Sequence, residues 1–177
     1  MGARYFGAAV RRREDPRFLR GDGRFVDDVV LPGLLHAAFL RSPHAHARLV
    51  SLDTKRARDL PGVRAVLTAA DVPAAAIIPN RVPAPAGADR YLQPAIARTV
   101  VRYVGEPVAL VVADDPYVAR DGAELIDAVY ETLPACSSVT AALAPGAPRL
   151  FDGTDTNNVA TITMRVGDAD AALAGCR

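Results

Sequence analysis

The sequence contains no tryptophan, only two cysteines and a single lysine, Lys55. Cys136 and Cys176 are far apart and form no Cys-x-x-Cys element, so neither a disulfide framework nor a zinc or iron–sulfur signature is present. Two free thiols in a reducing cytoplasm are expected. Long apolar runs are also missing, since a run such as residues 108–113 is far too short to cross a bilayer. We therefore predict a cytoplasmic protein without a membrane span.

Excess charge of either sign is absent as well, with 21 Lys and Arg residues against 20 Asp and Glu residues. A balanced charge provides no field that would attract nucleic acid or an anionic membrane. The arginines at 11–13 are followed by Glu14, Asp15 and Pro16 instead of an apolar stretch, which argues against an export signal. Arg11, Arg12, Arg13, Arg17 and Arg20 form a basic strip that we expect to face solvent or another subunit.

The length of 177 residues, of which 50% are hydrophobic, suits one well-cored domain with tails. Residues 1–20 carry clustered charge with little periodicity, which indicates an N-terminal arm. Gly21 and Gly23 mark a turn at the start of a domain predicted to cover residues 21–140. Residues 141–177 are predicted to be a linker, rich in Ala and Pro at 141–149, and the start of a following domain that is absent.

Short apolar runs bounded by turn residues predict the strands, which we place at 34–41, 45–52, 64–67, 108–113 and 128–133, with an extended segment from 25–28. Ala47, Leu49 and Ser51 would share one face of their strand. A helix capped by Asp53 or Thr54 is predicted to run through residue 60. These elements form a first strand–helix–strand unit.

A second helix is predicted to begin near Pro116, with Asp114 or Asp115 as its cap. Gly122 lies inside it at a cost of about 1 kcal/mol relative to Ala, which packing must offset. The two units predict a mixed α/β (α+β) fold with right-handed crossovers. Residues 73–97, rich in Pro and Ala, form a long connection.

The last part of the chain offers a possible strand at 161–166 and a helix opening at Ala169 that Asp168 could cap.

The three histidines are the first candidates for a metal site. His44 and His46 would share a strand face and could present two imidazoles to a metal ion. His36 and Asp53 are the nearby candidates for further ligands, but neither has a recognised spacing. We therefore interpret His44 and His46 as structural residues that form hydrogen bonds in a strand bend.

Glu106 lies in a turn just before a buried strand, where burial could raise its pKa for acid–base work. No second group accompanies it, so it is predicted to anchor the turn by accepting hydrogen bonds from backbone or arginine donors.

The remaining candidates give no support for chemistry. Gly21 and Gly23 fall short of a nucleotide-binding fingerprint and precede a strand. Asp27 and Asp28, as consecutive extended residues, would point to opposite faces. Cys136, Ser137 and Ser138 have no histidine partner nearby in the sequence. The sequence therefore predicts no catalytic, cofactor-binding or metal-binding residue in this chain.

Three segments carry a family resemblance, in the order Arg13-Glu-Asp-Pro-Arg-Phe-Leu-Arg-Gly-Asp-Gly-Arg-Phe-Val-Asp-Asp28, Pro32-Gly-Leu-Leu-His-Ala-Ala-Phe-Leu-Arg-Ser-Pro-His-Ala-His-Ala-Arg48 and Tyr103-Val-Gly-Glu-Pro-Val-Ala-Leu-Val-Val-Ala113. Together they resemble the α/β hammerhead domain that opens the large subunit of molybdenum hydroxylases. This family includes xanthine dehydrogenase, aldehyde oxidase and aerobic carbon monoxide dehydrogenase.

The resemblance implies an enzyme that oxidises an aldehyde, an N-heterocycle or carbon monoxide. Its electrons would pass from a molybdopterin cytosine dinucleotide centre through 2Fe–2S clusters to FAD. The implied partners are the molybdopterin-binding portion of the large subunit, an iron–sulfur small subunit and an FAD medium subunit. This chain matches none of the family's cofactor-binding motifs, so the resemblance implies a scaffold, as a split or truncated chain. A stand-alone binding or adaptor module that kept the fold is the alternative.

Overall fold

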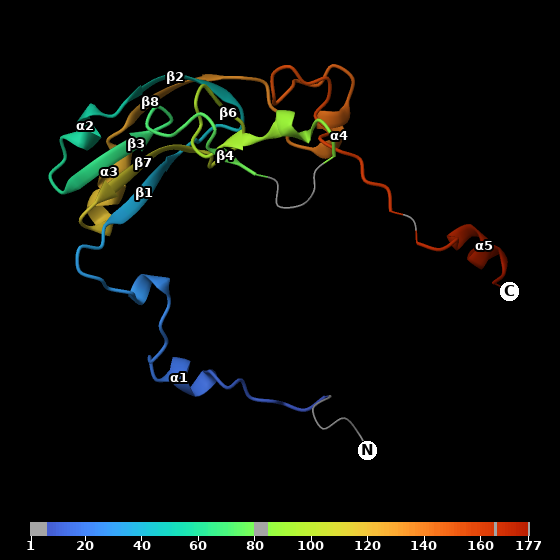
Figure 1. Ribbon diagram of the computed structural model, residues 1–177, viewed down its shortest axis with the longest axis horizontal. Helices are drawn as coiled ribbons and strands as arrows, with labels where there is room; N and C mark the ends of the chain where they lie inside the picture. Colours follow the sequence, from blue (N-terminus) through green and yellow to red (C-terminus); the bar gives the residue numbers. More distant parts are fainter. Residues whose placement is uncertain (1–6, 80–84, 165, 177) are drawn as a thin grey trace. The chain divides into compact units, whose positions relative to one another are not determined.

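The computed structural model describes residues 7–79, 85–164 and 166–176 (Figure 1). The chain divides into two compact units, Met1–Leu34 and Leu35–Arg177, which are described separately. No helix among the described residues is long and apolar enough to cross a membrane.

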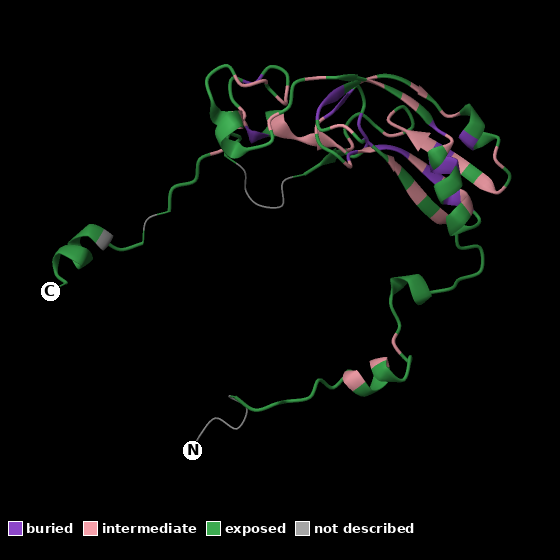
Figure 2. Ribbon diagram, turned by 180° about the vertical axis from the view of Figure 1, so that it is seen from behind, coloured by how far each residue is buried: buried purple, intermediate pink, exposed green. Residues whose placement is uncertain are grey.

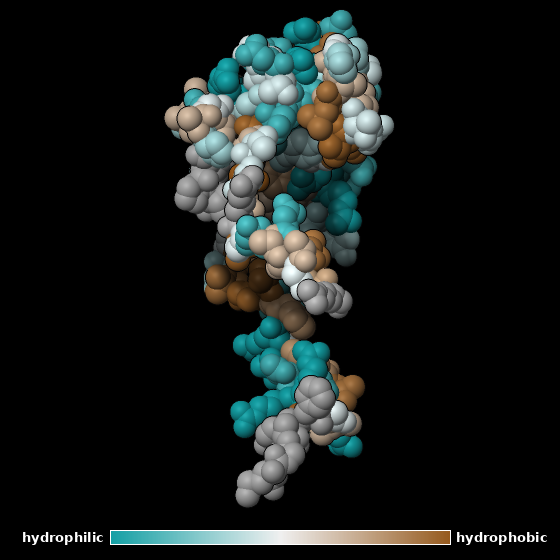
Figure 3. All heavy atoms as spheres, turned by 90° about the vertical axis from the view of Figure 1, so that its right-hand side faces the viewer, coloured by the Kyte–Doolittle hydropathy of each residue, from teal (hydrophilic) through white to brown (hydrophobic). Residues whose placement is uncertain are grey.

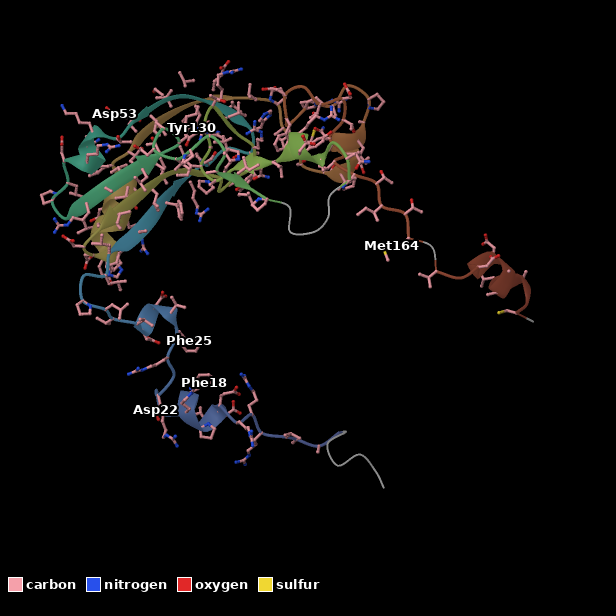
Figure 4. The ribbon with its side chains drawn as sticks, in the orientation of Figure 1. Phe18, Asp22, Phe25, Asp53, Tyr130 and Met164 are labelled. Carbon is pink, nitrogen blue, oxygen red and sulfur yellow. The ribbon has the colours of Figure 1, made fainter. Side chains whose placement is uncertain are left out.

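The first unit contains helix α1 (Asp15–Leu19) and the 3-10 helix η1 (Val26–Asp28). Gly21 has the positive φ of 76° that the predicted turn requires. The rings of Phe18 and Phe25, which Figure 4 labels, stack with a distance of 5.8 Å between their centroids. The predicted extended segment at 25–28 is wrong beyond Phe25. Phe25 has an extended backbone, but residues 26–28 form η1, and the Asp28 carboxylate accepts a 2.8 Å hydrogen bond from the Phe25 N–H.

The described residues of the second unit form two three-stranded antiparallel sheets and one short two-stranded ribbon. The first sheet has the order β1 (His36–Arg41), β7 (Pro107–Ala113), β3 (Val63–Thr68). The second has the order β6 (Val100–Val101), β2 (Ala47–Asp53), β8 (Asp127–Thr132). The ribbon pairs β4 (Ile77–Ile78) with β5 (Gln93–Pro94).

Helices connect and flank these strands. They are α2 (Lys55–Arg58), the 3-10 helix η2 (Ala88–Tyr91), α3 (Pro116–Glu124), α4 (Val139–Leu143) and α5 (Ala169–Ala174). The mixed α/β fold class is confirmed, but the predicted crossovers are wrong. Helix α2 leads from β2 to β3 and α3 leads from β7 to β8, so each helix connects two different sheets. Apolar runs predict where strands lie, but not which strands pair.

Helix α3 covers one face of the β1–β7–β3 sheet, in front of which it lies in Figure 2. Asp115 is its N-cap, with Oδ1 accepting a 2.7 Å hydrogen bond from the Tyr117 N–H. Gly122 lies so close to the sheet that an added Cβ would be 2.9 Å from Val111 Cγ1. The glycine therefore permits the close packing that offsets its low helix propensity.

In the part of the chain that the structure describes, the buried apolar residues form two clusters. The first comprises Ala57, Val66, Ala109, Val111, Ala123 and Ile126. The second comprises Ala47, Ala97, Val101 and Val108. Leu40 and Leu52 contact both clusters and so connect them.

Register shifts interrupt both sheets, on each side of β7 in the first and within β2 in the second, and they change which side chains face inward. Leu40 pairs with Ala109 and Arg41 with Pro107, so Val108 is an extra residue in β7. In β2 the register shifts between Leu49 and Ser51. The predicted face of Ala47, Leu49 and Ser51 is therefore wrong beyond Leu49, since Ser51 is exposed and Leu52 is half-buried in its place.

The long connection at 73–97 contains β4, η2 and β5, and its residues 80–84 lie outside the described part. Arg98 fixes its start by donating hydrogen bonds of 2.8–2.9 Å to the carbonyls of Ala69, Val72 and Pro73.

The predicted strand at 161–166 is wrong for residues 161–164 and 166, which have no strand structure, and residue 165 lies outside the described part. The predicted helix at Ala169 is confirmed. Asp168 caps α5 by accepting a 3.0 Å hydrogen bond from the Ala171 N–H.

Candidate functional site

The two most distinctive sequence motifs, residues 42–48 and 103–107, meet where β1 ends and β7 begins. The Ser42 N–H donates to the Glu106 carbonyl at 2.9 Å, and the Gly105 N–H donates to the Ser42 carbonyl at 2.8 Å. Arg41 Nη1 also donates to the Gly105 carbonyl at 2.8 Å. Backbone pairing therefore joins the motifs, and each helps to fix the shape of the other.

The histidines of this region lie in the bend before β2. Neither His44 nor His46 is in a strand, so the predicted shared strand face is wrong. His46 is 8% exposed, and its Nδ1 lies 2.7 Å from the carbonyl of Pro134, which makes Nδ1–H the donor. The His44 ring lies 5.0 Å from the ring of Tyr130, which Figure 4 labels on β8. The hydrogen bond confirms the interpretation for His46, whereas the printed contact of the His44 ring is aromatic.

Ser42 is the polar centre of this bend and is 2% exposed. Its Oγ accepts a 3.0 Å hydrogen bond from the His44 N–H and donates to the His44 carbonyl at 3.1 Å. Both hydrogen-bonding functions of the hydroxyl are therefore used within two residues, and the hydroxyl serves to close the turn.

Glu106 is 1% exposed, and its Oε2 accepts a hydrogen bond from the Arg102 N–H. The prediction that Glu106 anchors the turn is confirmed. Burial raises the pKa of the Glu106 carboxyl, while the hydrogen bond and positive charge of Arg102 partly oppose the rise. Oε1 has no hydrogen-bond partner among the described residues.

The other candidate ligands lie elsewhere. Asp53 Oδ1 accepts a 2.9 Å hydrogen bond from the Lys55 N–H at the start of α2, whereas the side chain of Thr54, the N-cap residue, makes no cap bond. His36 is at the far end of β1 from Ser42, paired with Ala113. The structure therefore does not bring His36 and Asp53 to the other histidines, and the described residues contain no group of three or more potential ligands.

The remaining candidates have local roles. Asp27 and Asp28 lie in η1 instead of an extended segment, which corrects the expectation of opposite faces. Ser138 caps α4 by accepting a 3.1 Å hydrogen bond from the Ala141 N–H, and Ser137 is exposed. Of the exposed arginines, Arg20 pairs with Asp22 at 3.1 Å and Arg17 lies 5.1 Å from the Phe18 ring centroid. Arg12 is 3.9 Å from Asp15, and Arg11 and Arg13 are exposed.

The sequence patterns did not predict a cavity of about 370 Å³ that lies beside the bend. Its lining includes His46, Tyr91, Arg102, Cys136 and Phe151. These residues come from segments far apart in the sequence, so no local pattern connects them. In the view of Figure 3, hydrophobic side chains form separate clusters among hydrophilic ones.

The stretch after β8 forms one wall of the cavity, and it makes specific contacts despite its Ala- and Pro-rich composition. Arg102 donates from Nε to the Leu150 carbonyl at 3.1 Å and lies 4.7 Å from the Phe151 ring centroid. Asn157 Nδ2 donates at 3.0 Å to the carbonyls of both Ala142 and Pro148. Asn157 lies in a segment that contains Thr and Asn residues, a composition typical of turns, and this was the sequence signal that could have indicated the turn.

The described residues that line this cavity do not fit a molybdenum cofactor. Arg102 supplies the permanent positive charge of the cavity lining, but Nε and Nη1 are already bound to the carbonyls of Leu150 and Val100. His46 uses Nδ1 for Pro134. A pyrophosphate-containing cofactor needs several free backbone or cationic donors, which this arrangement does not offer.

Comparison with known proteins places this architecture. Residues 20–134 match the family described as aldehyde oxidase and xanthine dehydrogenase, a/b hammerhead domain. The chain belongs to this family. It is 46% identical over 144 residues to the carbon monoxide dehydrogenase large chain of Afipia carboxidovorans, covering 81% of this chain and 17% of that one.

Two further relatives agree. The nicotine 6-hydroxylase large subunit of Paenarthrobacter nicotinovorans is 41% identical over 127 residues, covering 72% of this chain and 16% of the relative. The crystal structure of quinoline 2-oxidoreductase from Pseudomonas putida 86 matches with a TM-score of 0.72 and 44% identity, over 87% of this chain and 20% of that chain. The chain therefore spans 16–20% of the length of these large chains, and the family resemblance inferred from its motifs is confirmed.

Proposed function

We propose that this chain is the hammerhead part of the large subunit of a molybdenum hydroxylase, and that it acts as a scaffold for the molybdenum-binding portion and for partner subunits. One observation carries the proposal: the polar side chains of the distinctive motifs form hydrogen bonds with the chain's own backbone. These side chains are Ser42, His46 and Glu106. Polar groups that form internal hydrogen bonds stabilise the local backbone conformation and are not free to bind or activate a substrate.

The proposal extends to what lies outside this chain. Molybdopterin cytosine dinucleotide, 2Fe–2S clusters and FAD would belong to partner chains, and the complete enzyme would oxidise an aldehyde, an N-heterocycle or carbon monoxide in the cytoplasm. Within this chain no residue would be catalytic, cofactor-binding or metal-binding. The proposed parts are an arm at 1–20, the hammerhead domain at 21–140, and a linker with the start of a following domain at 141–177.

The test combines metal analysis, activity and assembly. The purified chain is expected to contain no stoichiometric molybdenum and to show no dye-linked aldehyde oxidation. Expressed together with a molybdenum-binding portion, it is expected to co-purify with it. Turnover by the isolated chain would contradict the proposal, and a failure to co-purify would favour a stand-alone adaptor module.

A further inference from the structure

The β1–β7–β3 sheet has a second apolar face, on the side opposite α3. The strand register places Phe39 beside Leu110, and Leu110 beside Leu67. The next row on the same side joins Ala37, Val112 and Ala65. We call these six side chains the open apolar face: Ala37, Phe39, Ala65, Leu67, Leu110 and Val112.

This face is less buried than its place in the sheet predicts. β7 is the central strand, with neighbours on both sides. Val111 and Ala113 are 0% exposed, whereas Leu110 and Val112, the intervening residues, are half-buried. Phe39 is 44% exposed on β1. A strand with a continuous apolar run is typical of a sheet covered on both faces, and among the described residues only the α3 face is packed in this way.

The β6–β2–β8 sheet provides an internal comparison. Its outer face alternates in the manner of a sheet that meets water on one side. Arg48 and Glu131 pair across it at 3.3 Å. The exposed side chains of its two long strands are Arg48, Val50, Ser51, Asp53, Asp127, Val129, Glu131 and Thr132, which are mostly polar. The β6–β2–β8 sheet therefore has a mostly polar, solvent-exposed face, whereas the β1–β7–β3 sheet is apolar on both faces.

We infer that the open apolar face is the surface on which the molybdenum-binding portion of the large subunit packs, an inference that rests on the proposed function. The relatives supply the occupant, since about four fifths of each large chain lies outside the match with this chain. The face carries no charged side chain, so its counterpart must be apolar and uncharged too. Arg41 lies 5.2 Å from the Phe39 ring centroid and supplies the polar rim that such contacts have.

The test uses the full chain carrying an affinity tag. It is expressed together with the Afipia carboxidovorans large chain from which the segment matching this chain has been removed, and the captured partner is measured per tagged chain. Phe39→Asp is expected to reduce capture by at least about tenfold, because it would bury an unpaired charge. Ala37→Asp, at an exposed position of the same face, is expected to act likewise.

The control is Val50→Asp, at a position that is 59% exposed in the other sheet, which is expected to leave capture unchanged. Thermal melts of the isolated variants show whether each variant has folded. If Phe39→Asp does not fold, the capture measured for Ala37→Asp tests the inference.

Equal capture by the unchanged chain and by both face variants would overturn this inference alone. No capture by the unchanged chain would overturn the proposed function, and the inference with it. Self-association that Phe39→Asp abolishes, with capture unaffected, would assign the face to a second copy and overturn the inference.

Discussion

At the scale of single residues, Glu106 combines burial with a local structural role. Its carboxyl lies at the junction of two motifs, and one oxygen accepts a hydrogen bond from the Arg102 N–H. An ionisable group of this kind stabilises the fold through its hydrogen bond and destabilises it through the desolvation of its charge. The balance between the two depends on pH.

Glu106 should make stability fall as pH rises. Burial raises the pKa of the folded-state carboxyl above its ordinary value of 4.5, so the folded protein binds the proton more tightly than the unfolded chain does. The free energy of unfolding should therefore decrease from pH 4.5 up through the raised pKa. Glu106→Gln, which stays neutral, should lack this contribution. Urea unfolding of both proteins across that pH range measures the difference, and a difference independent of pH would contradict the prediction.

At Gly122, close packing of α3 on the sheet requires a glycine. Gly122→Ala should gain up to about 1 kcal/mol in helix propensity but lose roughly 1–3 kcal/mol by overpacking, since the new Cβ would meet Val111 Cγ1 at 2.9 Å. A net loss of about 1 kcal/mol is expected. Val111→Ala removes the obstructing methyl, so the losses in the double variant should be less than additive. Thermal unfolding of the two single variants and the double variant measures this, and strict additivity would rule out the contact.

At the scale of elements, the start of α3 depends on one carboxylate. Asp115 Oδ1 accepts hydrogen bonds from the N–H groups of Tyr117 and Val118 at 2.7 and 3.3 Å. Asp115→Ala should lower the free energy of unfolding by about 1 kcal/mol, and Asp115→Asn should retain most of the stability. Asp114→Ala is the matched control. It breaks a surface ion pair with Arg64 and should cost less than Asp115→Ala in the same denaturant titration.

The helices and longer strands could be predicted because their signals are local. Pro116 after an aspartate and the apolar run from Val108 give α3 and β7 from neighbouring residues alone. Strand pairing could not be predicted in this way. The bulges at Val108 and after Leu49 depend on a partner strand far along the chain.

The same distinction applies to the candidate site. The anchoring role of Glu106 followed from a carboxylate in a turn before a buried strand, which is a local feature. The cavity could not be predicted, because Tyr91, Arg102 and Asn157, which line it, lie far apart in the sequence. Composition also concealed α4, since an Ala- and Pro-rich stretch is typical of a linker.

At the scale of the whole molecule, stability should reside in the second unit. Both apolar clusters and the residues packed against them lie between Ala38 and Tyr130. A chain of residues 35–177 should therefore unfold within about 3 °C of the full chain, the shift that roughly 1 kcal/mol produces in a domain of this size. Differential scanning calorimetry of the two proteins tests this. A much lower midpoint for the shorter chain would show that residues 1–34 contribute to the fold.

The extra residue in β7 has a consequence for how this family can vary. Val108 reaches the second cluster, while beyond it the strand resumes a strict alternation between the α3 side and the opposite side. Deletion of this residue would shift the register at the start of β7 by one position. Side chains there that now face the core would then face solvent. Length changes among relatives should therefore gather in connections such as residues 73–97, and the spacing between Glu106 and Ala109 should stay constant.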